Sequence, residues 1–225
     1  MGGQKSFLRS EWLENLNGDI NKIFCNSSHT VEWVCRRCHR NFKAKISERK
    51  ENDNCCPYYS KRELAVGYND LATTHPLVIK EWSALNDRES CSVMCNSNYR
   101  AWWKCSLCKG EYQREVQSKV IIKKPCPYCI NKKVLEGFND LATTHSYLLK
   151  EWDYLNNILL ADPTEINEKY QQPVWWKCKE NSNHRYKINE KFKYEKRSLI
   201  SCPICKGYRR KKERKNTLYS LKIYR

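Results

Sequence analysis

The stretch "WWKCSLCKGEYQREVQSKVIIKKPCPYC", Trp102–Cys129, contains two pairs of cysteines. Two residues separate Cys105 from Cys108, two separate Cys126 from Cys129, and 17 residues lie between the pairs. This spacing is typical of a structural zinc site, in which four thiolates close a tetrahedron and leave no position for a catalytic water. The stretch therefore predicts a small fold held together by zinc, with these four cysteines as ligands.

The same pattern occurs 70 residues earlier, because Trp33, Cys35, Cys38 and Cys56 align with Trp103, Cys105, Cys108 and Cys126. Around this pattern, "GYNDLATTH" at 67–75 recurs as "GFNDLATTH" at 137–145, with one difference in nine residues. A third, longer copy follows. Self-similarity at a fixed period indicates tandem units. We predict repeat 1 (7–66), repeat 2 (67–136), repeat 3 (137–208) and a basic tail (209–225).

Repeat 3 has no cysteine two residues beyond Cys178. His184 follows six residues later, and 17 residues then separate it from Cys202, the first cysteine of the final pair. Histidine is an ordinary replacement for cysteine at zinc. The predicted ligands of repeat 3 are therefore Cys178, His184, Cys202 and Cys205.

Repeat 1 supplies Cys35, Cys38 and Cys56, but Tyr59 occupies the fourth position. A neutral tyrosine is a poor zinc ligand, so Cys55 or His39 is a candidate substitute after a local change of the backbone. Alternatively, repeat 1 has lost or weakened its zinc. The sequence leaves these readings open, so it predicts two zinc ions with a possible third.

The bulk composition limits the class of protein. The chain has 225 residues and 14 Cys, with only 40% hydrophobic residues, so metal should replace part of a hydrophobic core. There is no secretory signal and no apolar stretch approaching 18 residues, so no membrane partner is expected. These features predict a cytoplasmic protein, or a nuclear one in a eukaryote. Cys25, Cys91 and Cys95 lie outside the pattern and are interpreted as free thiols.

Local patterns predict the elements around each site. Polar and apolar residues alternate after each first ligand pair, in "NFKAKIS", "GEYQREVQ" and "HRYKINEK", which indicates one strand of a hairpin. A short helix is expected to carry the last ligands, and another to begin at Pro76 with His75 or Thr74 as its cap. The fold class is therefore small α+β zinc-stabilised modules, three treble-clef-like repeats in tandem.

The segments "GYNDLATTHPLVIKEW", "AWWKC" and "CPYC" resemble the probable zinc-ribbon or treble-clef repeat domain found in tandem in bacterial and phage proteins. Some members of that family are joined to restriction-endonuclease-like domains. The resemblance covers about residues 7–208, and Tyr59 departs from its ligand pattern. It implies association with nucleic acid but names no biochemical activity.

Charge points to a polyanionic partner. Lys and Arg number 42 against 25 Asp and Glu, a formal net charge of +17. Basic residues follow each Cys-Pro segment and fill the tail, where they suit phosphate. The candidate nucleic-acid contacts are Lys61, Arg62, Lys132, Lys133, Arg209, Arg210, Lys211, Lys212, Arg214 and Lys215.

Three functions compete on these observations. The first is a non-enzymatic zinc-finger protein that binds nucleic acid, DNA ahead of RNA, mainly through the phosphate backbone. The alternative is an adaptor or inhibitor that docks on a nucleoprotein enzyme in phage or mobile-element conflict. An enzyme is not expected, because the zinc sites look filled and no paired acid and histidine stand out. No catalytic residue is therefore assigned.

Overall fold

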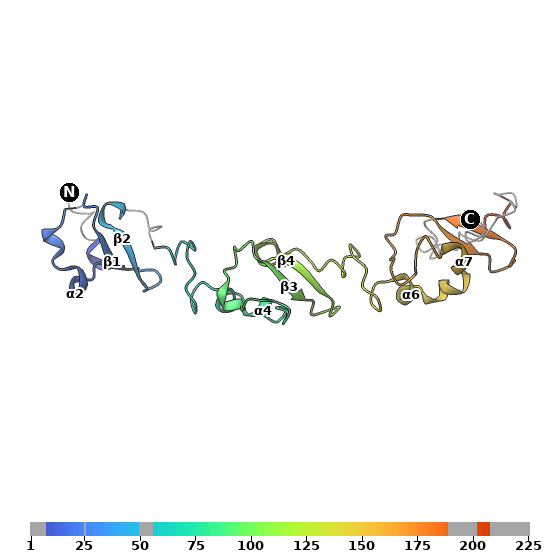
Figure 1. The fold of residues 1–225 in the computed structure, drawn as a ribbon, viewed down its shortest axis with the longest axis horizontal. Helices are drawn as coiled ribbons and strands as arrows, with labels where there is room; N and C mark the ends of the chain where they lie inside the picture. Colours follow the sequence, from blue (N-terminus) through green and yellow to red (C-terminus); the bar gives the residue numbers. More distant parts are fainter. Residues whose placement is uncertain (1–7, 25, 50–55, 189–201, 208–225) are drawn as a thin grey trace, which may run out of the picture. The chain divides into compact units, whose positions relative to one another are not determined.

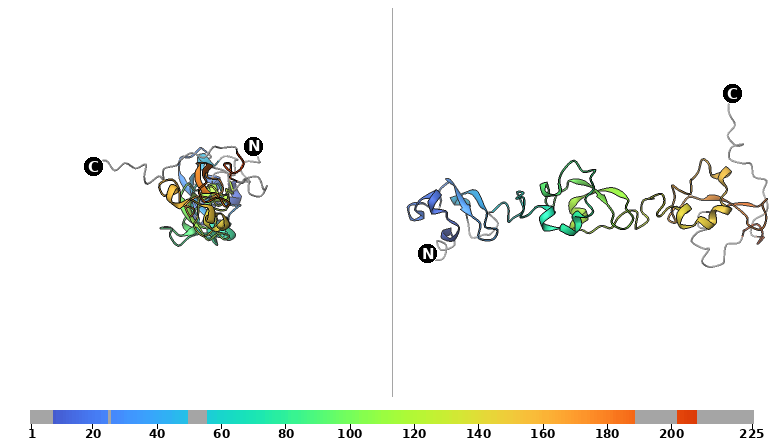
Figure 2. Two further views of the ribbon diagram at one scale, coloured as in Figure 1. Left: turned by 90° about the vertical axis from the view of Figure 1, so that its right-hand side faces the viewer. Right: turned by 90° about the horizontal axis from the view of Figure 1, so that it is seen from below.

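A computed structural model describes residues 8–24, 26–49, 56–188 and 202–207. Two compact units divide the chain, one of Met1–Ser106 with Glu111–Lys124 and one of Leu107–Gly110 with Pro125–Arg225. Short helices and two-stranded antiparallel hairpins make up both units (Figures 1 and 2). Among the described residues, no helix has the length and apolar character needed to cross a membrane.

Repeat 1 is built on one hairpin. Its strands β1 (Thr30–Val34) and β2 (Asn41–Lys45) pair with Trp33 opposite Phe42, as the alternating pattern predicts. The remaining elements are α2 (Glu14–Asn17), η1 (Ile20–Lys22) and η2 (Ile46–Glu48). The core of this repeat contains two metal-ligand candidates among its aromatic and aliphatic side chains: Trp12, Trp33, Cys35, Phe42, Ile46 and Cys56.

Repeat 2 has the same hairpin, formed by β3 (Arg100–Lys104) and β4 (Glu111–Glu115), with Trp103 opposite Tyr112. The helices are α3 (Leu71–Thr74), α4 (Pro76–Ile79), η4 (Ser90–Ser92) and α5 (Val116–Val120). The predicted helix start at Pro76 is confirmed. His75 is its N-cap residue, but the His75 side chain makes no capping bond.

The second unit contains the hairpin of repeat 3, β5 (Val174–Lys177) with β6 (Arg185–Ile188), in which Trp176 lies opposite Tyr186. The helices are α6 (Leu141–Thr144), η5 (Ser146–Glu151) and α7 (Tyr154–Asn157). Its core adds Leu148, Ile166 and Val174 to the tryptophans and ligands. The longer third copy therefore buries more aliphatic surface than the first.

An edge-to-face pair of tryptophans lies at the centre of every repeat. The ring centroids are 5.3, 5.3 and 5.1 Å apart, and a backbone bridge joins the same two residues each time: Trp12–Trp33, Trp82–Trp103 and Trp152–Trp176. Aromatic pairs favour this geometry, because the positive edge of one ring meets the negative face of the other. The recurring Trp positions therefore hold each hairpin against the segment that precedes it.

An asparagine side chain covers the outer strand of each hairpin. The amide groups of Asn17, Asn86 and Asn157 donate to one strand carbonyl and accept from the N–H of the same residue, which is Glu32, Trp102 or Trp175. Exposed strand edges otherwise pair with other chains. These amides occupy the free hydrogen-bonding groups, so the edge is partly closed.

The segment after each Cys-Pro forms turns, so the expected short helix carrying the last ligands is wrong in the described residues. A left-handed residue stands five positions beyond the first ligand of each pair: Lys61 (φ 57°), Asn131 (φ 55°) and Gly207 (φ 75°). Left-handed backbone cannot continue a right-handed helix, so the turn ends there.

Candidate metal centres

Four sulfur atoms converge in repeat 2. The Sγ atoms of Cys105, Cys108, Cys126 and Cys129 all lie within 4.8 Å of one another, and those of Cys108 and Cys126 are 3.6 Å apart. A disulfide would need about 2.05 Å. A zinc tetrahedron with Zn–S bonds of about 2.3 Å has edges of about 3.8 Å. The separation therefore fits sulfurs that share one zinc ion.

The first two ligands lie on a turn that leads from one strand into the next. In repeat 1 the Cys35 N–H donates to the Arg40 carbonyl at 2.9 Å, and the His39 N–H donates to the Cys35 carbonyl at 2.7 Å. His39 and its counterpart Lys109 have left-handed backbones, with φ of 55° and 59°. This reversal aims both sulfurs of the turn at one point.

Repeat 3 brings its histidine to the cysteines. The Nδ1 atom of His184 lies 3.2 Å from the Cys205 sulfur and 3.9 Å from the Cys202 sulfur, and the Cys178 and Cys205 sulfurs are 3.6 Å apart. A zinc ion with one nitrogen and three sulfur ligands has N–S edges of about 3.6 Å. The four predicted ligands therefore form one group, with Nδ1 as the ligating nitrogen.

Repeat 1 offers three ligands among the described residues: Cys35, Cys38 and Cys56. The Cys38 and Cys56 sulfurs are 3.6 Å apart, as in the complete sites. His39 is exposed and does not belong to this group, so the idea that it replaces the fourth ligand is wrong here. Cys55 lies outside the described residues. Tyr59 occupies the fourth position with a 38% exposed side chain.

The surroundings shift the thiol pKa values in opposite directions. Burial, followed by hydrogen bonding with the neighbouring thiols, raises the pKa of Cys56 to about 12. Burial also opposes ionisation of Cys35, but hydrogen bonds from the N–H groups of Cys38 and Arg37 lower its pKa overall. Backbone donors that stabilise a thiolate prepare it for a cation, and a bound divalent ion deprotonates coordinating thiols.

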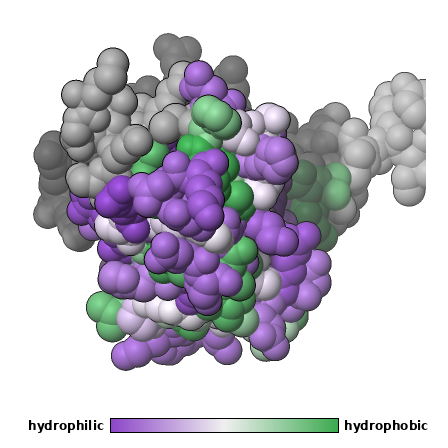
Figure 3. All heavy atoms as spheres, turned by 90° about the vertical axis from the view of Figure 1, so that its left-hand side faces the viewer, coloured by the Kyte–Doolittle hydropathy of each residue, from purple (hydrophilic) through white to green (hydrophobic). Residues whose placement is uncertain are grey.

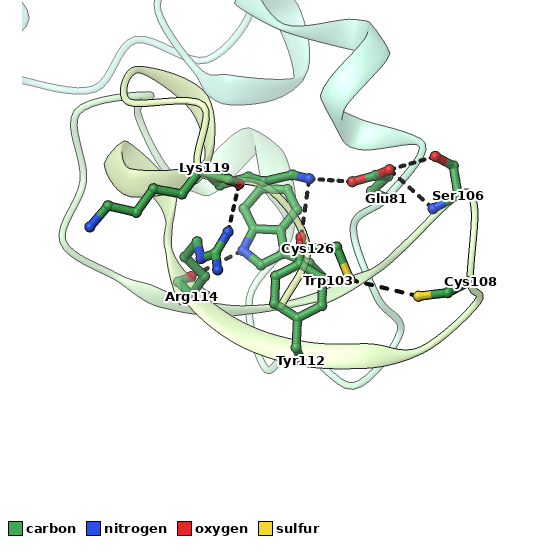
Figure 4. A network of polar contacts seen from close by, with 9 residues as sticks. Glu81, Trp103, Ser106, Cys108, Tyr112, Arg114, Lys119 and Cys126 are labelled. Atoms are coloured by element: carbon green, nitrogen blue, oxygen red, sulfur yellow. Dashed lines mark hydrogen bonds and ion pairs between the residues drawn. The ribbon is translucent and has the colours of Figure 1, made fainter. Parts of the chain in front are cut away.

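A recurring glutamate supports the ligand turn in repeats 1 and 2. One Glu81 oxygen accepts from the N–H and hydroxyl of Ser106, while the other pairs with Lys119 (Figure 4). In repeat 1, Glu11 accepts from the Arg36 N–H at 3.1 Å. Ser106 and Arg36 each follow the first cysteine of their pair. Our ligand search missed this residue, although Glu11, Glu81 and Glu151 recur at an offset of 70.

The cation paired with that glutamate also recurs. Arg49 and Lys119 are 70 residues apart, and each forms a salt bridge with the glutamate of its own repeat. Each cation also lies over the buried tryptophan, Arg49 at 5.2 Å from Trp33 and Lys119 at 5.8 Å from Trp103. Cation–π contact and ion pairing therefore tie the end of the hairpin to the ligand turn.

A second buried polar residue closes the turn of the last ligands. The Asn139 amide donates to the carbonyls of Tyr128 and Lys133 at 2.8 and 2.9 Å and accepts from the Leu135 N–H at 2.7 Å. Asn69 makes the matching bonds in the preceding copy. The next residue, Asp70 or Asp140, caps the following helix. "Asn-Asp" in the nonapeptide was the signal for both roles.

The candidate nucleic-acid contacts divide into two groups. Lys61, Arg62, Lys132 and Lys133 are exposed on the turns that follow the Cys-Pro segments. The six tail residues, Arg209–Lys212, Arg214 and Lys215, lie outside the described residues. Of the three cysteines taken as free thiols, Cys91 and Cys95 form no disulfide and belong to no ligand group, while Cys25 is outside the described residues.

Three Cys-rich ligand groups on short hairpins define a tandem zinc-finger protein, with zinc as the metal that these groups can hold. The family model described as "Probable Treble clef zinc finger domain" matches residues 8–62, 78–132 and 148–208, and the chain belongs to this family. The predicted treble-clef repeats are thereby confirmed. Comparison with curated proteins found no similar sequence.

Proposed function

We propose that this protein binds nucleic acid without catalysing a reaction and contacts mainly the phosphate backbone. The observation that carries the proposal is a repeated basic position. Lys61 with Arg62, and Lys132 with Lys133, occupy the same exposed turn in two successive zinc modules. Because each pair is held beside a metal-ligand turn, its charges are fixed in place and are available to phosphate.

The net charge of +17 supports the same proposal, since a polyanion would offset it. Hydrophilic side chains also cover most of the surface at the N-terminal end, around a narrow hydrophobic band (Figure 3). Contacts to phosphate carry no base information, so affinity should vary little with sequence and strongly with salt. DNA is the expected nucleic acid ahead of RNA, and the cytoplasm is the expected compartment.

The test removes the four turn cations by changing Lys61, Arg62, Lys132 and Lys133 to alanine. Mobility shifts are measured with duplex DNA, single-stranded DNA and RNA at several salt concentrations. Each lost duplex contact should reduce the log–log salt slope by about 0.9. A matched control changes four other exposed lysines to alanine: Lys43, Lys80, Lys104 and Lys150. Equal weakening by both sets would refute a role specific to the turns.

One observation favours the adaptor function as a second candidate. Five apolar side chains are 39–60% exposed on α7 and the turn that follows it: Tyr154, Leu155, Ile158, Leu159 and Leu160. Clustered exposed apolar residues often mark protein interaction sites. The Ile158→Ser, Leu159→Ser double variant separates the two functions. An adaptor would lose a partner whose association survives nuclease treatment, whereas nucleic-acid affinity would stay unchanged.

A further inference from the structure

Repeat 1 differs from repeat 2 in a connected set of residues beside the metal ligands. Tyr59 stands where repeat 2 has Cys129, and Tyr68 stands where it has Phe138. Tyr68 is also the one position at which the two nonapeptides differ. Loss of the fourth thiol in repeat 1 is therefore accompanied by the gain of two phenols.

Both phenols border the three thiols. The Tyr59 N–H donates to the Cys56 sulfur at 3.4 Å. Tyr68 lies close enough that burial, and then the negative charges of Cys38, Cys35 and Cys56, raise the pKa of its hydroxyl. A phenol that keeps its proton is a hydrogen-bond donor beside a metal and a poor ligand to it.

Two arginines accompany the two tyrosines. The Arg37 guanidinium is 5.9 Å from the centre of the Tyr59 ring, and that of Arg40 is 5.5 Å from the centre of the Tyr68 ring. The corresponding residues of repeat 2 are uncharged, Leu107 and Gly110. The three-thiol site therefore gains positive charge exactly where repeat 2 has none, on the residues that contact the phenols.

The fold makes room for one of these arginines. In repeat 2, a Cβ on Gly110 would lie 2.7 Å from the Leu135 side chain and 2.8 Å from that of Tyr128, so a larger residue is excluded. The residue of repeat 1 that corresponds to Leu135 is Ala65. With the smaller alanine, Arg40 fits and donates to the Val66 carbonyl at 3.2 Å. The changes are thus sterically coupled.

We propose that repeat 1 holds its metal through Cys35, Cys38 and Cys56 and keeps the fourth position for an exchangeable ligand. Water occupies it in the free protein, and a small thiolate replaces the water. Zinc sites with three protein ligands keep such an open position, and sulfur is a preferred donor. The arginines favour an anionic ligand, and the phenols offer it hydrogen bonds. This inference is independent of the proposed nucleic-acid function.

The test loads the full chain with Co²⁺ in place of zinc and adds 2-mercaptoethanol, with a phosphine as the only other reductant. In the wild type, thiolate-to-cobalt charge-transfer absorption should rise, and the visible bands should shift, for one of three bound ions. Tyr59→Cys should show the added thiolate absorption from the start and no response to 2-mercaptoethanol. Tyr59→Phe, which keeps the ring, should respond like the wild type and serves as the folding control.

A second variant tests the role of charge. Arg37→Leu introduces the residue of repeat 2 and should weaken binding of 2-mercaptoethanol several-fold while leaving binding of neutral imidazole unchanged. Three results would overturn the proposal. These are two bound Co²⁺ ions per chain, a thiol response in Tyr59→Cys equal to that of the wild type, and loss of a thiolate band in Cys55→Ser, which would show that the chain itself closes the site.

Discussion

The Glu81 carboxylate accepts two hydrogen bonds from Ser106, one from the backbone N–H at 3.0 Å and one from the hydroxyl at 2.7 Å. Ser106 directly follows the ligand Cys105, so this contact holds the ligand turn from a segment 25 residues away. The other Glu81 oxygen pairs with Lys119, which lies over the Trp103 ring. One side chain thus connects the ligand turn to the hairpin core.

We expect Glu81→Gln to destabilise the protein by about 2 kcal/mol, because the Lys119 ammonium loses its counter-charge while only 15% of its side chain is exposed. Urea unfolding of the zinc-loaded chain measures the change. Glu136→Gln, at an exposed position, is the control and should stay within about 0.5 kcal/mol of the wild type. Equal stability of both variants would contradict a supporting role for Glu81.

The same pair predicts a pH dependence. Burial raises the pKa of Glu81, but hydrogen bonds from Lys119 and Ser106 outweigh it and lower the value below the ordinary 4.5. A carboxylate with a lowered pKa stabilises the folded state above its unfolded pKa and loses that contribution as the pH falls. The difference in unfolding free energy between wild type and Glu81→Gln should therefore shrink below about pH 4.5. A constant difference down to pH 3 would contradict the assignment.

Asn139→Ala should destabilise repeat 2 and loosen its zinc. The side chain is 6% exposed, and its removal leaves two carbonyls and one N–H of the last-ligand turn without these partners. Each unsatisfied buried group costs about 1–3 kcal/mol, so a loss of at least about 2 kcal/mol is expected. Chelator competition and urea unfolding provide the measurements. Asn96→Ala, at an exposed position, should change neither.

Metal analysis tests the ligand groups of repeats 2 and 3. We expect at least two zinc ions per chain, and the loss of one in His184→Ala, because Nδ1 of His184 is one of the four converging ligand atoms. His184→Cys supplies a thiolate from the same turn and should restore the metal if the turn adjusts to the shorter side chain. Fewer than two zinc ions in folded wild type would contradict both sites.

Truncation after Gly207 tests the basic tail. It removes no predicted zinc ligand, so the zinc content should be retained. If Arg209–Lys212, Arg214 and Lys215 contact phosphate, affinity should fall similarly for unrelated sequences, and the salt slope should fall by about 0.9 for each lost duplex contact. Unchanged affinity and slope would identify the tail as a solvated run of charge. A fall for one sequence only would indicate base reading.

The sequence by itself determined the features that depend on short spacing. Two residues between Cys105 and Cys108 suffice to predict a ligand turn, because the turn geometry is local, and alternation suffices for the hairpin strands. The offset of 70 extended both predictions to the other copies. His184 was found in the same way, by counting 17 residues back from Cys202.

Only the tertiary structure decided which distant residues meet at each site. Glu81 reaches Lys119 across 38 residues, and Asn139 replaces the expected helix with a closed turn. Arg40 fits beside Tyr68 because Ala65 leaves space that Leu135 fills in repeat 2. Such contacts depend on the path of the whole chain and on side-chain volume. Spacing along the sequence encodes neither, so the ligands were predictable while their supports were not.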